Sequence, residues 1–356
     1  MRVAVVAAFV LAGVAVGATL AIGGGPRNAY AVHALVSDEQ RRASQVDARL
    51  VNAWGLAASP TGPWWTSNEA SATSTLYSGA GRKQLLTVSV EGGPTGIAYY
   101  GGKGLRVSAG GRSDPTRFVY ACEDGKLRAW TPTVPKGWST EAIVVVDEGA
   151  EAAVFRGVAI VGERVYATDF HNARVDVYDA RWQRVRRAGA FIDRSIPEWY
   201  APFGIQAIGG RLFVTYVARA PVNGNDSPTG GYVDEFDRAG RLLGRVARSG
   251  VLNAPWGIAR APRSFGRFGG DLLVGNFGDG RINAFRRDGS GWSYDGTLHT
   301  TRGKPLVVNG LWALAFGNGG TAGPAGTLFF ASGPHDWLGE TELGVHGLVG
   351  SISARS

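Results

Sequence analysis

A short cassette, in which a small residue precedes an aliphatic one, recurs six times along this chain of 356 residues. Successive copies lie 41 to 61 residues apart, and their small residues are Gly55, Gly96, Gly157, Gly204, Gly257 and Ala313. A repeat of roughly 40–50 residues is typical of propellers and solenoids. The repeat therefore overrides the expectation of two domains that chain length alone would give, at about 150 residues each.

Strand patterns follow the cassette in each repeat. In the third repeat, residues 165–168 form a hydrophobic strand, residues 169–173 supply a polar turn, and residues 174–178 alternate back to an aromatic residue. Four short antiparallel strands in each repeat, with the cassettes innermost, predict an all-β fold, a six-bladed β-propeller. The sixth repeat ends one strand short. We expect residues 31–36 to complete it by pairing with the C-terminal strand, which closes the ring and removes two exposed edges.

The first 31 residues differ from the rest. Arg2 precedes an apolar run over residues 3–22, and a small-x-small sequence ends at Ala31. This pattern is that of a secretory signal peptide, cut after Ala31. The run is about twenty residues, which is also long enough to span a bilayer as an uncleaved N-terminal anchor. Both interpretations place the propeller, residues 32–356, outside the cytoplasm, either secreted or anchored to the membrane.

Charge and cysteine content narrow the possible partners. The formal net charge is +8, and one cluster of arginines is expected on a solvated outer strand. The cluster consists of Arg181, Arg184, Arg186 and Arg187. In an exported protein it does not indicate nucleic-acid binding, whereas attraction to anionic envelope polymers or lipid headgroups stays open. Cys122 is the only cysteine, so it cannot form an internal disulfide, and its place in a strand predicts a buried side chain.

Several longer strings resemble an uncharacterised family of exported bacterial six-bladed propellers. The strings lie at 52–57, 167–171, 201–206, 252–257 and 275–282, and the resemblance covers nearly everything from Leu35 to Ile352. Some members of that family carry a PEP-CTERM sorting signal, which the last residues of this chain do not match. More distantly, the repeat is similar to NHL-type propellers and to the gluconolactonase and regucalcin enzymes. The family resemblance itself implies no activity.

The distant enzyme resemblance implies a divalent metal on the channel axis. Carboxylate and amide oxygens would hold it, from the position just before the small residue of each inner strand. Here these positions are occupied by Trp54, Thr95, Arg156, Phe203, Trp256 and Trp312. None offers the carboxylate or amide oxygen that calcium needs. We therefore expect no metal, no cofactor and no lactonase chemistry of that type.

The same six positions are expected to ring one mouth of the channel. Four aromatic rings with one guanidinium suit a sugar ring, an anionic group or an extended peptide. The alternative is that the indoles pack between the blades and seal the channel, because large aromatic side chains serve packing more often than ligand binding.

A second ring of residues comes from the turns after the second strand of each blade, which lie on the same face. It contains Asn68, Glu69, Glu123, Asp124, Asp169, His171, Tyr216, Asn276, Asp279, His335 and Asp336. The recurring Asn and Asp residues, among them Asp169 and Asn276, are expected to bind backbone amides within the turns. His171, Tyr216 and His335 depart from this pattern. Together with Arg156, they are the better functional candidates.

Two hypotheses about function remain. In the first, the chain is an exported, non-enzymatic, monomeric propeller that binds a small molecule, glycan, peptide or envelope protein on this face. In the second, it is a metal-independent hydrolase or lyase in which Asp169 orients His171 as a general base beside Arg156. The sequence lacks the established reaction motifs, which favours the first hypothesis. A mouth closed by tryptophans would leave surface binding alone. An open mouth, with Arg156 and His171 within reach of a common point, would favour the enzyme.

Overall fold

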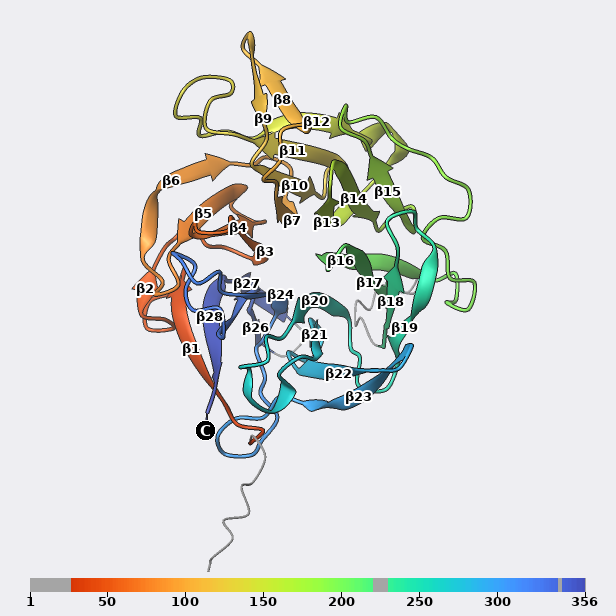
Figure 1. Cartoon of the computed structure of the whole chain (residues 1–356). Coiled ribbons are helices and arrows are strands. Elements are labelled where there is room, and N and C mark those ends of the chain that lie inside the picture. Colours follow the sequence, from red (N-terminus) through yellow and green to blue (C-terminus); the bar gives the residue numbers. More distant parts are fainter. Residues whose placement is uncertain (1–26, 220–229, 339–340, 356) are drawn as a thin grey trace, which may run out of the picture.

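The computed structural model describes residues 27–219, 230–338 and 341–355. Figure 1 looks down the axis of a ring of six blades around a central channel, which confirms the predicted six-bladed propeller. The innermost strands are those of the cassettes: β3 (Ala53–Ala58), β7 (Pro94–Tyr99), β13 (Phe155–Val161), β16 (Tyr200–Ile208), β20 (Pro255–Arg260) and β24 (Leu311–Phe316). Residues 1–26 of the predicted signal peptide or anchor lie outside the described residues.

The other strands of each blade follow outward in antiparallel order. Blade 1 continues with β4 (Trp64–Asn68), β5 (Thr73–Tyr77) and β6 (Lys83–Ser89); blade 2 with β10 (Phe118–Cys122), β11 (Lys126–Trp130) and β12 (Ile143–Asp147); blade 4 with β17 (Arg211–Ala218), β18 (Tyr232–Phe236) and β19 (Leu242–Arg248); blade 5 with β21 (Leu272–Asn276), β22 (Ile282–Asp288) and β23 (Gly291–Thr297). A small hairpin, β8 (Arg106–Ala109) and β9 (Arg112–Pro115), lies at the outer rim of blade 2 (Figure 1).

Blade 3 has a different outer edge. Its regular sheet contains β13, β14 (Arg164–Asp169) and β15 (Arg174–Tyr178). Beyond β15 the chain is irregular over residues 179–199, where only a single bridge joins Arg184 to Tyr178. The arginine cluster at 181–187 was expected on an outer strand. It lies instead on this irregular segment, and that placement was wrong.

The ring closes in blade 6 as predicted. There β24 is followed by β25 (Leu328–Ser332) and β28 (Leu348–Ala354), and the N-terminal strand β1 (Tyr30–Ser37) pairs antiparallel with β28. The short strand β2 (Gln45–Val46) then pairs in parallel with β1. The Tyr30 side chain is buried against Phe265 and Phe268, so the closing strand is also anchored in the core.

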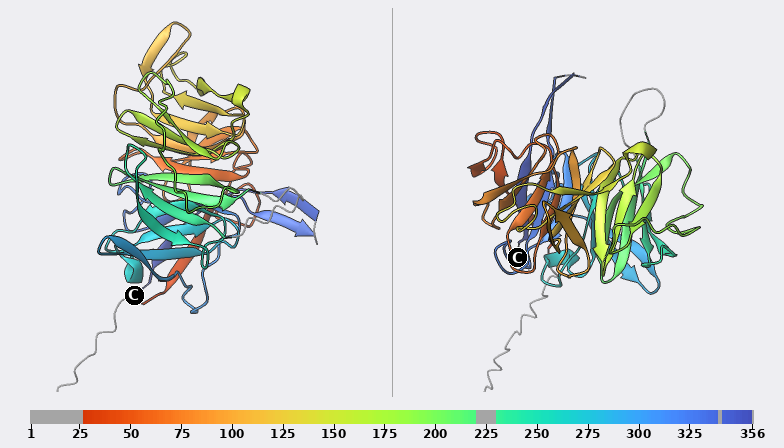
Figure 2. Two further views of the ribbon diagram at one scale, coloured as in Figure 1. Left: turned by 90° about the vertical axis from the view of Figure 1, so that its right-hand side faces the viewer. Right: turned by 90° about the horizontal axis from the view of Figure 1, so that it is seen from above.

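One long turn forms a projecting element. The hairpin of β26 (His335–Leu338) and β27 (Thr341–Val345) stands out from one face of the ring (Figure 2). It follows Ser332, which pairs with the first residue of β24, so it lies on the face where the inner strands begin. We call this the upper face.

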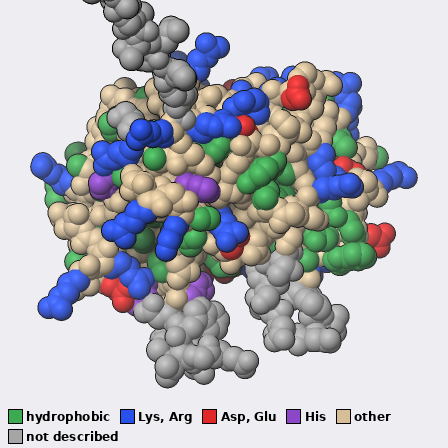
Figure 3. Space-filling model, turned by 90° about the horizontal axis from the view of Figure 1, so that it is seen from below, with side chains coloured by type: hydrophobic (Ala, Val, Ile, Leu, Met, Phe, Trp, Pro, Cys, Tyr) green, Lys and Arg blue, Asp and Glu red, His purple; other side chains and the backbone are tan. Residues whose placement is uncertain are grey.

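The core consists of apolar layers between neighbouring blades. Trp65 of blade 1, for example, stacks on Phe118 of blade 2 with ring centroids 4.1 Å apart. The predicted burial of Cys122 is confirmed, and burial raises the pKa of its thiol to about 12. Two short 3-10 helices complete the described secondary structure, η1 (Gly149–Glu151) and η2 (Gly266–Phe268). Within the described ranges, the structure holds no helix of the length and apolarity that a membrane crossing requires. Lys and Arg side chains are scattered over the outer surface (Figure 3).

Close approach of the inner strands requires the small residue of the cassette. A Cβ at Gly257 would lie 2.3 Å from the Trp312 carbonyl oxygen of the next blade. We expect Gly257→Ala to lower the free energy of unfolding by about 1–3 kcal/mol, because the backbone must shift to relieve this clash. Urea denaturation would measure the loss. Blade 6 has Ala313 at the equivalent position, so Ala313→Gly is the matched control, expected to cost no more than about 1 kcal/mol. A Gly257→Ala variant as stable as the wild type would contradict the close approach.

Candidate functional site

Aromatic side chains close the upper mouth of the channel. Trp54 and Trp312 stack with ring centroids 3.5 Å apart, and Phe277 also stacks on Trp312, at 3.9 Å. Trp256 meets both indoles edge-on, and Phe203 meets Trp312 in the same way. Trp54 and Trp312 are only 5% and 3% exposed. The alternative in which the indoles pack together is therefore the arrangement found, and we call these five rings the aromatic plug.

Little space remains beneath the aromatic plug. A cavity of about 20 Å³ lies between the inner strands, next to Trp256, which is room for roughly one water molecule. The other end of the channel opens into a wider pocket of about 400 Å³, lined by the far ends of the inner strands. A ligand on the upper face would therefore lie over the aromatic plug rather than inside the channel.

Charged residues form one side of the rim around the aromatic plug. Each blade places one residue at this rim, directly after its second strand in five blades and at the equivalent register within β17 in blade 4: Glu69, Glu123, Phe170, Val217, Phe277 and Gly333. The rim is thus acidic in blades 1 and 2 and mainly apolar in the others. The carboxyl groups of Glu69 and Glu123 flank Gly93, and one oxygen of each lies 3.3 Å from the point that a Cβ on Gly93 would occupy.

Arg156 connects the acidic side of the rim to the aromatic plug. Its guanidinium forms an ion pair with Glu123 and lies over the rings of Trp54 and Phe170, 5.2 and 5.6 Å from their centroids. The Arg156 side chain is 23% exposed, although its Nε is buried and has no hydrogen-bond partner within the described part of the chain. At the other end of this arc, the Asn52 amide donates to Glu69 over 2.7 Å. Asn52, Glu69, Glu123 and Arg156 therefore form a continuous polar arc.

Burial shifts the proton equilibria of this arc. Burial raises the pKa of Glu123; the charge of Arg156 opposes the shift and the neighbouring Glu69 carboxylate adds to it. Burial likewise lowers the pKa of Arg156, against the attraction of both glutamates. The rim thus combines hydrogen-bond acceptors, a cation and an easily protonated carboxyl group.

Several predicted site residues serve the fold instead. Thr95 is fully buried and donates to the carbonyl oxygens of Ala121 and Phe155, which ties blade 2 to blade 3. The Asn276 amide donates to the Val251 carbonyl oxygen over 2.8 Å. Tyr216 is 6% exposed and packs in the core between blades 3 and 4, not at the mouth.

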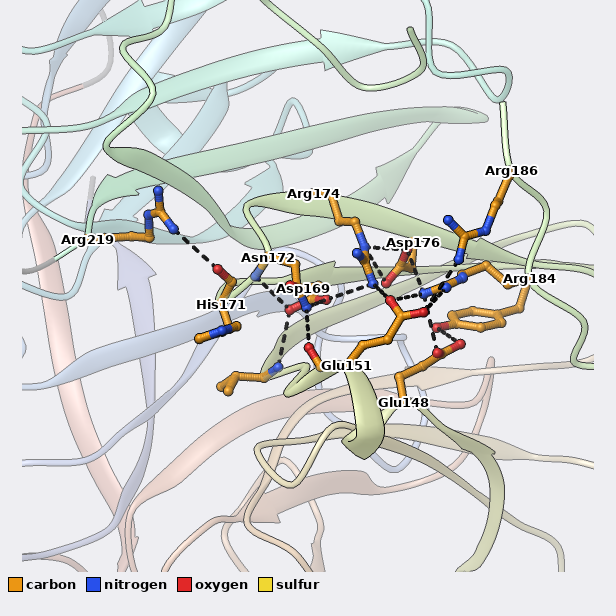
Figure 4. Close-up of polar contacts among 12 residues, drawn as sticks. Glu148, Glu151, Asp169, His171, Asn172, Arg174, Asp176, Arg184, Arg186 and Arg219 are labelled. Carbon is orange, nitrogen blue, oxygen red and sulfur yellow. Dashed lines mark hydrogen bonds and ion pairs between the residues drawn. The ribbon is translucent and has the colours of Figure 1, made fainter. Parts of the chain in front are cut away.

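The two predicted histidines are not positioned for catalysis with Asp169. The Asp169 carboxylate accepts from the backbone N–H of Val154 and Asn172 and pairs with Arg174, as expected for a turn residue. His171 is exposed, and its ring is turned away from Asp169 (Figure 4). His335 lies at the start of the β26–β27 hairpin, and its ring meets Phe277 edge-on at 6.2 Å. Arg156 pairs with Glu123 instead, and the mouth beside it is filled by stacked rings.

Sequence reasoning placed Glu69 and Glu123 in the second ring but did not select them as site residues. The signal that identifies them is their position in the repeat, because the equivalent residues in the other four blades are Phe170, Val217, Phe277 and Gly333. Among the described residues, no group of three or more His, Cys, Asp and Glu side chains could hold a metal ion.

Comparisons with known proteins agree with the fold. No protein-family model matches the chain. An aldose sugar dehydrogenase from Streptomyces coelicolor, solved in its PQQ-bound form, is 16% identical with a TM-score of 0.54, and the match covers 92% of this chain and all of that chain. The soluble aldose sugar dehydrogenase from Escherichia coli, in its apo form, is 13% identical with the same TM-score and the same coverage. At these identities the likeness shows the propeller fold alone.

Closer relatives come from a virus. One uncharacterised protein of Acanthamoeba polyphaga mimivirus is 32% identical over 309 residues, which is 82% of this chain and 80% of the relative. A second from the same virus is 32% identical over 350 residues, 92% of this chain and 82% of the relative. These relatives do not support the expected bacterial origin or a PEP-CTERM sorting route. The chain belongs to the family of six-bladed propellers that includes these uncharacterised mimivirus proteins.

Proposed function

We propose that this protein is an exported binding propeller that holds a glycan across the upper face, over the aromatic plug. One observation carries the proposal: the carboxyl pair of Glu69 and Glu123, with Arg156, lies beside partly exposed aromatic rings at one rim. Those rings belong to Phe170, Trp256 and Phe277. Aromatic faces that contact carbon skeletons, with a few fixed polar groups, are the usual composition of small-ligand sites.

Polar groups at the rim favour a ligand that is rich in oxygen. The Arg156 guanidinium belongs to a side chain that is 23% exposed and donates hydrogen bonds, and the carboxylates of Glu69 and Glu123 accept them. Sugar hydroxyls both accept and donate, so they complement both kinds of group. The indole N–H groups of Trp54, Trp256 and Trp312 are buried and so do not contribute to this recognition. A glycan therefore suits the polar arc together with the partly exposed aromatic rings.

Calorimetric titration of the protein with neutral oligosaccharides and cell-wall glycan fragments tests the proposal. We expect Glu123→Gln, which keeps the side-chain shape, to weaken glycan binding by about tenfold, equivalent to about 1.4 kcal/mol. The matched control is Glu163→Gln, in the exposed turn between β13 and β14 at the opposite face, which is expected to bind like the wild type. Absence of binding in the wild type, or equal binding by Glu123→Gln, would overturn the assignment.

A hydrolase or lyase remains the second candidate, with different residues from those expected. The observation that favours it is the carboxyl pair, since a carboxyl group of raised pKa beside a carboxylate can divide the roles of acid and base. Product release from a bound glycan by the wild type, lost in Glu69→Gln, would assign an enzyme. Binding without any product would assign the binding protein.

Export is proposed from the N-terminal sequence, and β1 constrains where a signal could be cut. Asn28 bonds the backbone of Thr297 and His299, and the buried Tyr30 begins β1. Cleavage after Ala31 would remove both residues from the fold. We therefore propose that a signal peptide is cut before Asn28, or that residues 3–22 are retained as an anchor.

A further inference from the structure

A basic pocket lies at the outer edge of blade 3, where residues 179–199 run beside the sheet without forming a regular strand. Its volume is about 390 Å³. Apolar side chains contribute to its walls, including those of Val177, Val185 and Phe191. Six arginines line it as well, against a single lining carboxylate, that of Asp176: Arg164, Arg174, Arg184, Arg186, Arg187 and Arg238. We call this cavity the blade-3 edge pocket.

Two of these arginines are held by ion pairs. Arg174 donates to Asp176 over 2.9 Å and contacts Glu151 over 2.6 Å. Arg184 pairs with Glu151 and with Glu148, the latter over 3.3 Å. Both glutamates come from the η1 region, as Figure 4 shows. Hydrogen bonds from Arg184 and Arg174 lower the pKa of Glu151 to about 2, so this carboxylate is ionised at neutral pH. These ion pairs hold the side chains of Arg174 and Arg184 in place and so fix the shape of the pocket.

The remaining arginines exceed the acidic groups available. Arg164, Arg187 and Arg238 are exposed, and none forms an ion pair within the described ranges. Arg186 has a side chain that is 75% exposed and makes one long contact, 3.4 Å, to Glu151. Six guanidinium groups therefore face four carboxylates, those of Asp169, Asp176, Glu148 and Glu151. Like charges gathered at a concave site raise the local potential and attract counterions.

We propose that the blade-3 edge pocket binds a glycan that carries sulfate or phosphate esters. Guanidinium groups match the oxygens of these esters and can bind them in a bidentate manner. The apolar part of the lining provides a surface for the carbon skeleton of a sugar. The volume lies within the range of roughly 300–1,000 Å³ that is typical of ligand pockets, and it suits a few sugar units rather than a long duplex. This site is separate from the upper face and does not depend on the function proposed there.

The test must separate this pocket from the general basicity of the protein, since the formal net charge is +8 and basic side chains cover other surfaces too (Figure 3). The pocket variant replaces Arg186, Arg187 and Arg238 by alanine. The control variant removes the same charge elsewhere, from the exposed Arg263, Arg302 and Arg355. Binding of a heparin tetrasaccharide is followed by calorimetry at low and at physiological salt, with inorganic sulfate and phosphate as competitors.

We expect the pocket variant to bind the tetrasaccharide at least about tenfold more weakly, and the control variant to stay within about twofold of the wild type. Equal losses in the two variants would mean attraction by net charge only and would overturn the site. Tighter, pocket-dependent binding of phosphatidylglycerol vesicles or of a DNA duplex would overturn the glycan assignment. Because the replaced side chains are exposed, thermal melts should coincide. If the triple variant is unstable, Arg187→Glu alone is expected to reduce binding in the same direction, and unchanged binding would overturn the proposal.

Discussion

A chain that begins at Asp38, and so lacks β1, is expected to lose cooperative folding. Strand β1 completes blade 6 and pairs along β28, from Tyr30 opposite Ala354 to Ser37 opposite Leu348. Its side chains at Tyr30 and Val36 are each only 1% exposed. Removing two such side chains, together with the backbone ladder, is expected to cost more than about 5 kcal/mol. That is comparable with the whole stability of a typical protein, about 5–15 kcal/mol.

Shorter truncations separate the contribution of Tyr30 to stability from that of the rest of β1. A chain that begins at Val32 loses Tyr30 and its contacts but keeps most of β1, so we expect a loss of about 3–5 kcal/mol. A chain that begins at Arg27 keeps the whole strand and serves as the control. Circular dichroism melts and urea denaturation compare the three. A cooperative melt of the Asp38 chain at the temperature of the control would contradict closure by β1. If the protein is exported as proposed, the intact mass of the mature chain is expected to place its first residue before Asn28, which leaves β1 complete.

The repeat made the fold predictable because its small residues have one dominant physical role. The inner strands approach so closely that a Cβ at Gly204, for example, would lie 2.3 Å from the Trp256 carbonyl oxygen. A comparable clash would arise at Gly55, Gly96 and Gly257, so the constraint recurs in four of the six blades and leaves a periodic signal in the sequence. Ring closure was predictable for a related reason, since one blade lacked a strand and one N-terminal segment was apolar enough to supply it.

The site was less predictable because it depends on the orientations of individual side chains, which the repeat does not encode. Trp54 and Trp312 were expected at the mouth, but their stacking depends on how two blades are rotated against each other. Tyr216 shares the turn position of Asp169 and nevertheless points into the core. The missing regular strand at the edge of blade 3 was not visible either, because the segment that replaces it begins with an ordinary turn and a basic sequence. These features follow from tertiary packing, which overrides local pattern.

Replacing Trp312 by alanine is expected to open the upper mouth and to destabilise the propeller strongly. The indole is 3% exposed and lies at the centre of the aromatic plug, in contact with Trp54, Trp256, Phe277 and Phe203. Loss of a buried indole costs about 3–5 kcal/mol, because its contacts disappear and the surrounding rings collapse only in part. The control is Trp138→Ala, since that side chain is 93% exposed and its loss should change stability by less than about 0.5 kcal/mol.

A phenylalanine at position 312 tells packing apart from hydrogen bonding. The indole Nε1 of Trp312 is buried with no partner within the described residues, so Trp312→Phe removes an unpaired donor along with some apolar surface. We therefore expect Trp312→Phe to cost less than about 2 kcal/mol, because the ring still stacks and the substitution leaves no unpaired donor at position 312. A loss as large as that of alanine would mean that the N–H group has a partner, such as an ordered water in the channel. An alanine variant as stable as the wild type would mean that the mouth is open and that the indoles do not pack as a plug.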